Sequence, residues 1–465
     1  MTDFISVINP ATEALVKEIP VDDGDAVAQK VALARAAQPA WSARSLLERI
    51  EPLKRFSALL TERAESLALI LTTETGKPIA QAKSEILTAP SRVDYFIEQV
   101  GEVLAPDVVY REPADSPPET AQLEEIIGYD PLGVIANISA WNYPYFVGVN
   151  VFVPALLTGN AVLYKPSEIA TMTGLAIAAL LHEAGVPEDV FVPVVGMGST
   201  GAALLDQAID GVFFTGSYAT GKKIAIAAAP KLIKVQLELG GKDPAYVCED
   251  VDVEKAAIGL ADGAFYNNGQ SCCAVERIYV HTDIYNVFLS AFLKAVEGFS
   301  LGDPTDAETY FGPLSRKPQL AVLQEQIADA VEKGAVVHPR THGVDRAGWY
   351  FAPTVVTQVT HEMSLMREET FGPVIGIQRV SSDDEAITLM NDTDYGLTAA
   401  VYCAQRERAM GILGQVSSGS AYWNCCDRVS PRLPWTGRHH SGIGSTLSQI
   451  GISAFLQPRG WHLRQ

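Results

Sequence analysis

The 465-residue sequence has a shortage of basic charge, few cysteines and no long apolar run. Acidic residues outnumber basic residues by 55 to 35, which gives a net charge of −20. Because such a field repels polyanions, we expect neither nucleic acid nor an anionic membrane as a partner. The longest apolar stretch, Val147 to Leu157, is too short to span a bilayer. The first residues also lack the basic and apolar regions of a signal peptide.

The six cysteines include two adjacent pairs, Cys272-Cys273 and Cys425-Cys426, and no Cys-x-x-Cys spacing. This arrangement is a poor framework for disulfides or for zinc. The adjacent His439 and His440 have no further ligand at a suitable spacing, so we expect them on the surface and expect no bound metal. The cysteine pattern therefore predicts a reduced, cytoplasmic protein.

The remaining composition is that of an ordinary globular protein, with 48% hydrophobic and 19% charged residues. The length predicts two or three domains. Residues 25–71 have helical spacing that Pro39 and Pro52 are expected to break. From 132 onward, and again over 244–403, short apolar runs alternate with helical segments, which predicts an α/β fold with parallel sheets and crossover helices. Segments 104–121 and 445–465 are predicted to be extended arms.

Two glycine-rich turns follow phosphate-binding motifs incompletely. The first, Gly196 to Gly201, matches G-x-G-x-x-G, but Gly216 and Ser217 lie where the motif expects an acidic residue. It is either a dinucleotide turn or a plain tight turn. The second begins at Gly216 and follows the P-loop pattern until Lys223 takes the place of the magnesium-binding Ser or Thr, which argues against an ATPase. That turn still offers backbone N–H groups and a helix N-terminus to a pyrophosphate.

The strongest chemical signal is Cys272, which lies among small and polar residues between a predicted helix and strand. This setting suits a nucleophile, and it also fits an ordinary buried thiol. An amide such as that of Asn142 can donate to an oxyanion, and the glycines after Glu238 let the backbone approach a ligand closely. The four other segments of interest are Ala140-Trp141-Asn142-Tyr143-Pro144, Lys165-Pro166-Ser167-Glu168, Glu238-Leu239-Gly240-Gly241-Lys242 and Glu368-Glu369-Thr370-Phe371-Gly372-Pro373.

In this order and spacing, the five segments resemble the aldehyde dehydrogenase superfamily, and in particular its hydrolytic, NAD(P)-dependent members. The likeness runs from Ile8 to Gly444. It implies a Rossmann-type cofactor domain (1–103 and 126–239), an α/β catalytic domain (240–443) and a small β oligomerisation arm (104–125 and 444–465). It also implies a homodimer, or a tetramer of two dimers, in which each arm joins the sheet of a neighbouring subunit.

The resemblance implies that Cys272 attacks the aldehyde, while the Asn142 amide and the Cys272 N–H hold the oxyanion of the thiohemiacetal. Glu238 then activates the water that hydrolyses the thioester; the plain alternative is a salt-bridged surface carboxylate. A carboxylate at Glu168 faces the adenosine ribose and repels a 2′-phosphate, which favours NAD over NADP. The matching cofactor positions are Ala140, Trp141, Lys165, Glu168, Gly198, Gly216, Ser217, Leu239, Glu369 and Phe371.

Two departures from the family pattern are visible: Ala140 replaces a Pro, and Ser445-Thr446 replaces Arg-Glu. Neither is expected to touch a reacting group. Succinate semialdehyde dehydrogenases typically carry an Arg where this chain has Asn150, and aminoaldehyde enzymes often carry an aromatic residue there, so the substrate class stays open. The candidate residues of the substrate pocket are Tyr143, Asn150, Glu98, Arg428, Val429 and Trp435.

Three other functions compete with a hydrolytic dehydrogenase. A CoA-acylating dehydrogenase would lack the carboxylate of Glu238. A catalytically idle binding protein would have no need of Cys272, Glu238 and Asn142 together. A thiol esterase would leave the nucleotide positions Lys165, Glu168 and Glu369 without a purpose.

Overall fold

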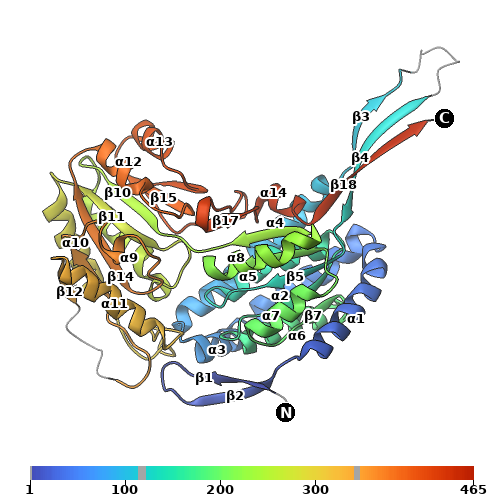
Figure 1. Ribbon diagram of the computed structural model, residues 1–465, viewed down its shortest axis with the longest axis horizontal. Coiled ribbons are helices and arrows are strands. Elements are labelled where there is room, and N and C mark those ends of the chain that lie inside the picture. The colour runs from blue at the N-terminus through green and yellow to red at the C-terminus, as the bar shows by residue number, and fades with distance from the viewer. Residues whose placement is uncertain (1–2, 114–121, 340–345, 465) are drawn as a thin grey trace.

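The computed structural model describes residues 3–113, 122–339 and 346–464. Two large sheets, covered by helices, form two lobes, and a narrow arm projects from one of them (Figure 1). The predicted α/β fold, with parallel strands and crossover helices, is confirmed. A short hairpin near the N-terminus, β1 (Phe4–Ile8) with β2 (Leu15–Pro20), packs beside the first lobe through a small apolar cluster of its own.

Four helices follow this hairpin, and the expected breaks at Pro39 and Pro52 are wrong. Both prolines lie inside helices, and the chain turns instead at Ser45. There the Ser45 and Glu48 side chains each bond the other residue's backbone N–H, a capping box that fixes where a helix starts. The helices are α1 (Gly24–Ser42), α2 (Leu46–Glu62), α3 (Ala64–Thr75) and α4 (Ile79–Leu104).

The six-stranded sheet of the first lobe has the order β17-β9-β8-β5-β6-β7. All of its neighbouring strands are parallel except the short β17, which pairs antiparallel with β9. Parallel strands bring their carboxyl ends to one edge, where ligands of such folds bind. The strands are β5 (Val134–Ile138), β6 (Ala161–Lys165), β7 (Phe191–Pro193), β8 (Gly211–Thr215), β9 (Lys234–Glu238) and β17 (Gly442–Ile443). The helices between them are α5 (Pro144–Leu157), α6 (Thr171–Ala184), α7 (Gly198–Asp206) and α8 (Tyr218–Ala228), followed by the short η1 (Ala229–Lys231).

The seven-stranded sheet of the second lobe has the order β12-β13-β14-β11-β10-β15-β16, and only β12 runs antiparallel to its neighbour. Its strands are β10 (Asp243–Val247), β11 (Val275–His281), β12 (Val336–Pro339), β13 (Thr354–Thr357), β14 (Val374–Val380), β15 (Thr398–Tyr402) and β16 (Ser420–Trp423). Its helices are α9 (Val253–Phe265), η2 (Tyr266–Gly269), α10 (Tyr285–Glu297), α11 (Gln319–Glu332), η3 (Ser364–Met366), α12 (Asp383–Asn391), α13 (Arg406–Leu413) and η4 (His439–Ser441).

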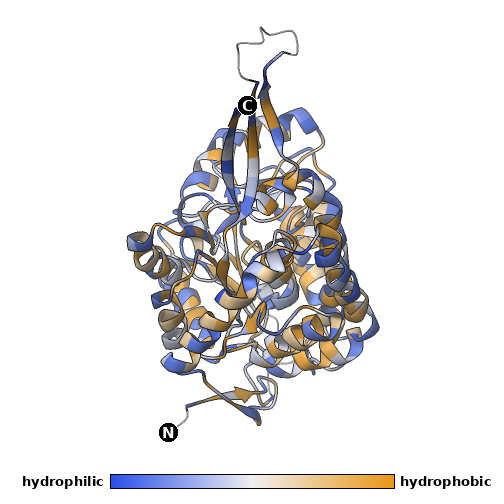
Figure 2. Ribbon diagram, turned by 90° about the vertical axis from the view of Figure 1, so that its right-hand side faces the viewer, coloured by the Kyte–Doolittle hydropathy of each residue, from blue (hydrophilic) through white to orange (hydrophobic). Residues whose placement is uncertain are grey.

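The arm is a three-stranded antiparallel sheet of β3 (Asp107–Arg111), β4 (Leu123–Pro131) and β18 (Leu456–Arg464), and it stands clear of both lobes (Figure 2). The expectation that all of 445–465 is extended is wrong, because α14 (Ser448–Ser453) packs on α4 and buries Ile452. The part of the first arm at 114–121 lies outside the described residues. The domain ranges stay a prediction; β4 crosses one of the proposed boundaries, and β17, which falls inside the proposed catalytic range, pairs with the sheet of the first lobe.

Candidate active site

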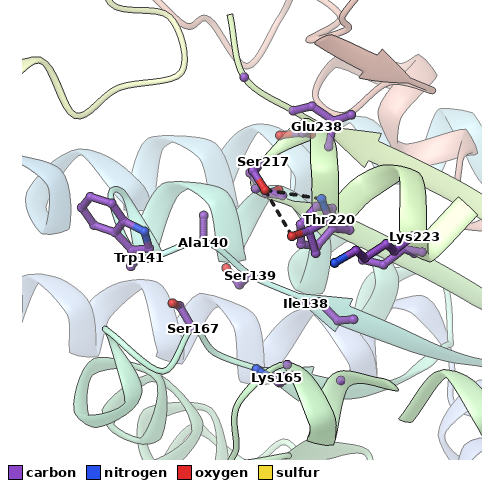
Figure 3. A pocket seen from close by; sticks show the side chains of 18 of the residues that line it. Ile138, Ser139, Ala140, Trp141, Lys165, Ser167, Ser217, Thr220, Lys223 and Glu238 are labelled. Carbon is purple, nitrogen blue, oxygen red and sulfur yellow. Dashed lines mark hydrogen bonds between the residues drawn. The ribbon is translucent and has the colours of Figure 1, made fainter. Parts of the chain in front are cut away.

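A cavity of about 700 Å³ lies at the carboxyl edge of the six-stranded sheet, with walls from both lobes. Its lining includes all three catalytic candidates, Cys272, Glu238 and Asn142, and every cofactor position named from the sequence. Figure 3 shows how residues at or just after the ends of β5, β6 and β8, such as Trp141, Lys165 and Ser217, surround this space. Segments that are far apart in the sequence therefore meet where the strand topology places them.

The loop that carries Cys272 is held in an unusual backbone shape. Asn267 and Asn268 have φ angles of 54° and 56°, and Gly269 follows with 67°. Asn and Gly tolerate this left-handed region better than other residues. The Asn268 side chain donates to the carbonyl groups of Gly312 and Pro313, each at 2.8 Å. These bonds fix the loop so that Cys272 reaches the cavity.

The neighbouring Cys273 is buried and does not line the cavity. Its thiol donates to the Asp427 carboxylate at 3.0 Å. A hydrogen-bonding contact with the Cys272 side chain, together with burial, raises the pKa of Cys273 well above its usual value. Of the two adjacent thiols, Cys272 is therefore the one placed to meet a ligand.

Hydrogen bonds hold both the side chain and the backbone carbonyl of Asn142. Its Nδ2 donates to the Gln270 carbonyl at 3.1 Å, which ties it to the cysteine loop and leaves its second amide hydrogen for a ligand. Its own carbonyl accepts from the Lys77 ammonium at 2.6 Å. Lys77 in turn forms a buried ion pair with Glu85, whose carboxylate also accepts from the Tyr145 N–H at the start of α5. Sequence reasoning missed Lys77 and Glu85, because the two are linked to Asn142 only through space.

Glu238 ends strand β9 and is buried, and this burial raises the pKa of its carboxyl to about 7. The Thr446 hydroxyl donates to it, and the Gln236 amide donates at 3.4 Å. The expectation that the Ser445-Thr446 departure touches no reacting group is therefore wrong for Thr446. The reason is the pairing of β17 with β9, which brings residues 442–446 beside Glu238.

The cofactor candidates line the cavity with polar, charged and aromatic side chains. Ser217 caps α8 by accepting from the Thr220 N–H, so the helix N-terminus opens toward the cavity (Figure 3). At the other end, Trp141 and Phe371 meet edge to face with ring centres 5.6 Å apart. Glu369 lies between the two lobes and accepts from the Gly241 N–H at 3.1 Å; burial, with the nearby Glu276, raises its pKa to about 8.

These features fit a nicotinamide dinucleotide. A helix N-terminus suits a pyrophosphate, and paired aromatic rings suit a nicotinamide. A Cβ on Gly240 would overlap the Glu369 carboxylate, so a side chain there would displace Glu369 from its present position. The buried Lys165 ammonium makes just one long hydrogen bond among the described residues, to the Pro166 carbonyl at 3.4 Å. Exposed Glu168 lies on the rim beside it.

The substrate-pocket candidates are not gathered in this cavity. Asn150 and Trp435 are buried, and Asn150 accepts from the Arg92 guanidinium at 2.9 Å. Trp435 pairs through its backbone with Thr446. Tyr143 and Val429 are partly buried, whereas Glu98 and Arg428 are exposed. Arg92, which contacts Asn150, was not singled out from the sequence.

The family model described as "Aldehyde dehydrogenase family" matches residues 2–460. The chain belongs to the aldehyde dehydrogenase family. It is 34% identical to lactaldehyde dehydrogenase of Escherichia coli (99% of this chain, 95% of the relative). It is also 34% identical to the NADP-dependent succinate-semialdehyde dehydrogenase of Deinococcus radiodurans (98% and 94%). The crystal structure of PnpE in complex with nicotinamide adenine dinucleotide superposes with a TM-score of 0.93 at 32% identity (99% and 94%).

This aldehyde dehydrogenase is an oxidoreductase that uses NAD or NADP, as the sequence resemblance implied. Within the described ranges, no helix is long and apolar enough to cross a membrane. Nor do the residues placed by the structure bring together three His, Cys, Asp or Glu side chains that would hold a metal ion. His440 instead stacks on Tyr218, and His439 contacts the Ser417 hydroxyl.

Proposed function

We propose that the protein oxidises an aldehyde to its carboxylic acid through a thioester on Cys272. The observation that carries this proposal is that Cys272, Glu238 and Asn142 line the same cavity as the cofactor candidates. A nucleophile, an oxyanion donor and a general base are the groups that this chemistry requires. A CoA-acylating enzyme would have no use for Glu238, and an esterase would have none for the nucleotide residues.

In the first half of the reaction, the sulfur of the Cys272 thiolate bonds to the carbonyl carbon, the carbonyl π bond breaks, and its electron pair makes the carbonyl oxygen an oxyanion. The free N–H of the Asn142 amide and the Cys272 backbone N–H stabilise that oxyanion. When bound, the nicotinamide accepts the hydride that leaves as the oxyanion collapses to the thioester. The network of Lys77, Gln270 and Asn267 keeps the Asn142 donor in place during this step.

In the second half, Glu238 removes a proton from water as the water oxygen bonds to the thioester carbon. The carbon–sulfur bond then breaks, which releases the acid and regenerates the Cys272 thiolate, and Glu238 returns its proton to solvent. A base works best when its pKa lies near the working pH, and the value of about 7 that burial gives Glu238 meets that condition.

For the cofactor, we propose NAD in preference to NADP. Glu168 lies on the rim of the cavity beside Lys165. Its carboxylate accepts from a ribose 2′-hydroxyl and repels a 2′-phosphate. The proposal also includes a cytoplasmic location.

For the assembly, we propose a homodimer or a tetramer built from two dimers, joined through the arm. The arm exposes many large apolar side chains on adjacent strands, which a neighbouring subunit would cover. They are Val108, Val109, Tyr110, Tyr129, Trp461 and Leu463.

The test is NADH formation, followed by absorbance, with a panel of aldehydes and with Glu238→Gln as the diagnostic variant. The wild type should turn over steadily, whereas Glu238→Gln should give one rapid burst of NADH followed by slow turnover, because thioester hydrolysis alone has lost its base. A full steady-state rate without a burst would show that another group activates water. Acyl-CoA release on addition of CoA, with no free acid, would favour the acylating alternative.

A further inference from the structure

Six cationic side chains are buried in the described part of the chain, and four of them are fully compensated. Lys77 and Lys242 form ion pairs with glutamates. Arg49 and Arg277 each donate to several backbone carbonyl groups. Burying a charge without such partners is costly, so an uncompensated buried cation calls for an explanation.

The two exceptions are Lys165 and Arg92. Lys165 lines the cofactor cavity, where a ligand would complete its hydrogen bonds. Arg92, on α4, forms no ion pair among the described residues, and its one hydrogen bond runs from Nη1 to Asn150 Oδ1. Its Nε and Nη2 have no partner in that part of the chain. These two nitrogens lie on the same edge of the guanidinium, which is the edge that binds a carboxylate through two parallel hydrogen bonds.

The place of Arg92 in the fold connects it to the reacting centre. Its guanidinium carbon lies 4.0 Å from the centre of the Phe146 ring, and Phe146 stacks on Tyr143. Tyr143, Phe146 and Asn150 recur at three- and four-residue spacing, so they share one face of α5. That face begins beside Asn142, the oxyanion donor. Phe146 and Tyr143 are only partly buried, so this face is not closed by the core.

The carboxylates of Glu85 and Glu238 attract Arg92 through space, but among the described residues neither is hydrogen-bonded to it, and each accepts from other groups. Glu85 pairs with Lys77 and accepts from the first turn of α5. Glu238 accepts from Thr446. Asp427 accepts from the Cys273 thiol. Arg92 remains cationic, because burial lowers its pKa only to about 10.

We propose that Arg92 binds the anionic end of the substrate, and that the substrate is therefore an aldehyde acid, a short aldehyde with a terminal carboxylate. The inference rests on the proposed function, and it names the substrate class of that site. Asn150 holds the Arg92 guanidinium against the Phe146 ring and leaves Nε and Nη2 of Arg92 available. The two oxygens of the substrate carboxylate would accept hydrogen bonds from these nitrogens.

The experiment compares succinate semialdehyde, butanal and γ-aminobutyraldehyde, which share one carbon chain and carry an anionic, a neutral or a cationic end. Wild-type kcat/KM should favour succinate semialdehyde over butanal by at least about tenfold, as expected for a hydrogen-bonded charge. Arg92→Gln should raise KM for the semialdehyde by a similar factor and leave KM for butanal within about threefold; because the Arg92 charge also lowers the pKa of Glu238, any change in kcat should be shared by both aldehydes. Arg92→Lys keeps the charge but loses the pair of parallel N–H donors. Its KM for succinate semialdehyde should lie between those of the wild type and Arg92→Gln.

Arg55→Gln is the matched control, since Arg55 is an exposed arginine on α2, and it should leave the preference unchanged. Calorimetric titration supplies a readout without turnover: succinate should bind the wild type more tightly than its neutral analogue succinamide. This comparison decides the matter even if Arg92→Gln fails to fold.

Equal loss with every aldehyde in Arg92→Gln would overturn the proposal, because Arg92 would then act on Glu238 rather than on substrate. Preference of the wild type for butanal or γ-aminobutyraldehyde would overturn it as well. Absence of NADH with all aldehydes would instead contradict the proposed function itself.

Discussion

The Thr446 hydroxyl donates a hydrogen bond to the carboxylate of Glu238, although the two residues lie at opposite ends of the last half of the chain. Burial raises the pKa of Glu238, and this donor lowers it by stabilising the ionised form. The charge of Arg92 and the Gln236 hydrogen bond lower it further, and together these effects leave the pKa at about 7. We therefore expect Thr446 to act as a positioning residue that keeps the proposed base available near neutral pH.

Because a general base must be ionised, steady-state turnover should rise with pH through about 7. Thr446→Val removes the donor and should move this rise upward by about one pH unit, since one unit corresponds to about the free energy of one such hydrogen bond. Thr446→Ser keeps the hydroxyl and should restore the wild-type profile. A pH profile that is identical in the valine variant would show that the bond does not tune Glu238.

Cys272→Ala should abolish oxidation and leave NAD binding intact, because a covalent nucleophile has no substitute in this cavity. Turnover and the quenching of protein fluorescence by NAD provide the two measurements. Cys273→Ala is the matched control, and it should keep most of the activity because its thiol faces Asp427 rather than the cavity. More than about a hundredth of wild-type turnover in Cys272→Ala would mean that the nucleophile lies elsewhere.

Glu168→Ser should raise the use of NADP relative to NAD, as measured by the ratio of kcat/KM values with one aldehyde. The change removes both the repulsion of a 2′-phosphate and the acceptor for the 2′-hydroxyl. We expect a shift in the ratio of about tenfold or more. Glu188→Ser, on an exposed loop before β7, is the control and should leave the ratio alone. An unchanged ratio in Glu168→Ser would place the ribose elsewhere.

Deletion of 457–465 removes most of β18 and uncovers the edge of β4, so it should weaken subunit association and lower solubility. Light scattering across a concentration series measures the first effect. Leu232→Ala, which trims an exposed apolar residue remote from the arm, should change neither property. If the intact protein were an active, monodisperse monomer, the proposed assembly would be wrong.

Local sequence signals predicted much of the fold, because strand ends, glycine turns and helical spacing depend on residues that are close together in the sequence. The alternation of short apolar runs and helical segments from residue 132 onward is a case in which the residue pattern alone sufficed to predict parallel sheets with crossover helices. Pro39 misled, because one lost backbone hydrogen bond in a helix is outweighed by capping and packing nearby.

The candidate site divides in the same way. Cys272, Glu238 and Asn142 could be named because each lies in a distinctive local segment. Lys77, Arg92 and Thr446 could not be named from the sequence. Each contacts a residue at least 58 positions away, and only the fold brings the two together. A buried cation that lacks partners, such as Arg92, can be recognised only from the three-dimensional structure.

The pairing of β17 with β9 has a consequence for how the protein is made. Strand β9 leaves the ribosome roughly two hundred residues before β17, which at about 5–20 residues per second means an interval of about 10–40 s. Until then β9 is an open sheet edge, the kind of surface on which nascent chains aggregate or recruit chaperones. Glu238 receives its backbone partner Gly442 and its side-chain partner Thr446 only from this final stretch of translation. A truncated nascent chain would thus contain the nucleophile and the nucleotide-binding residues, yet would lack the groups that hold its base in place.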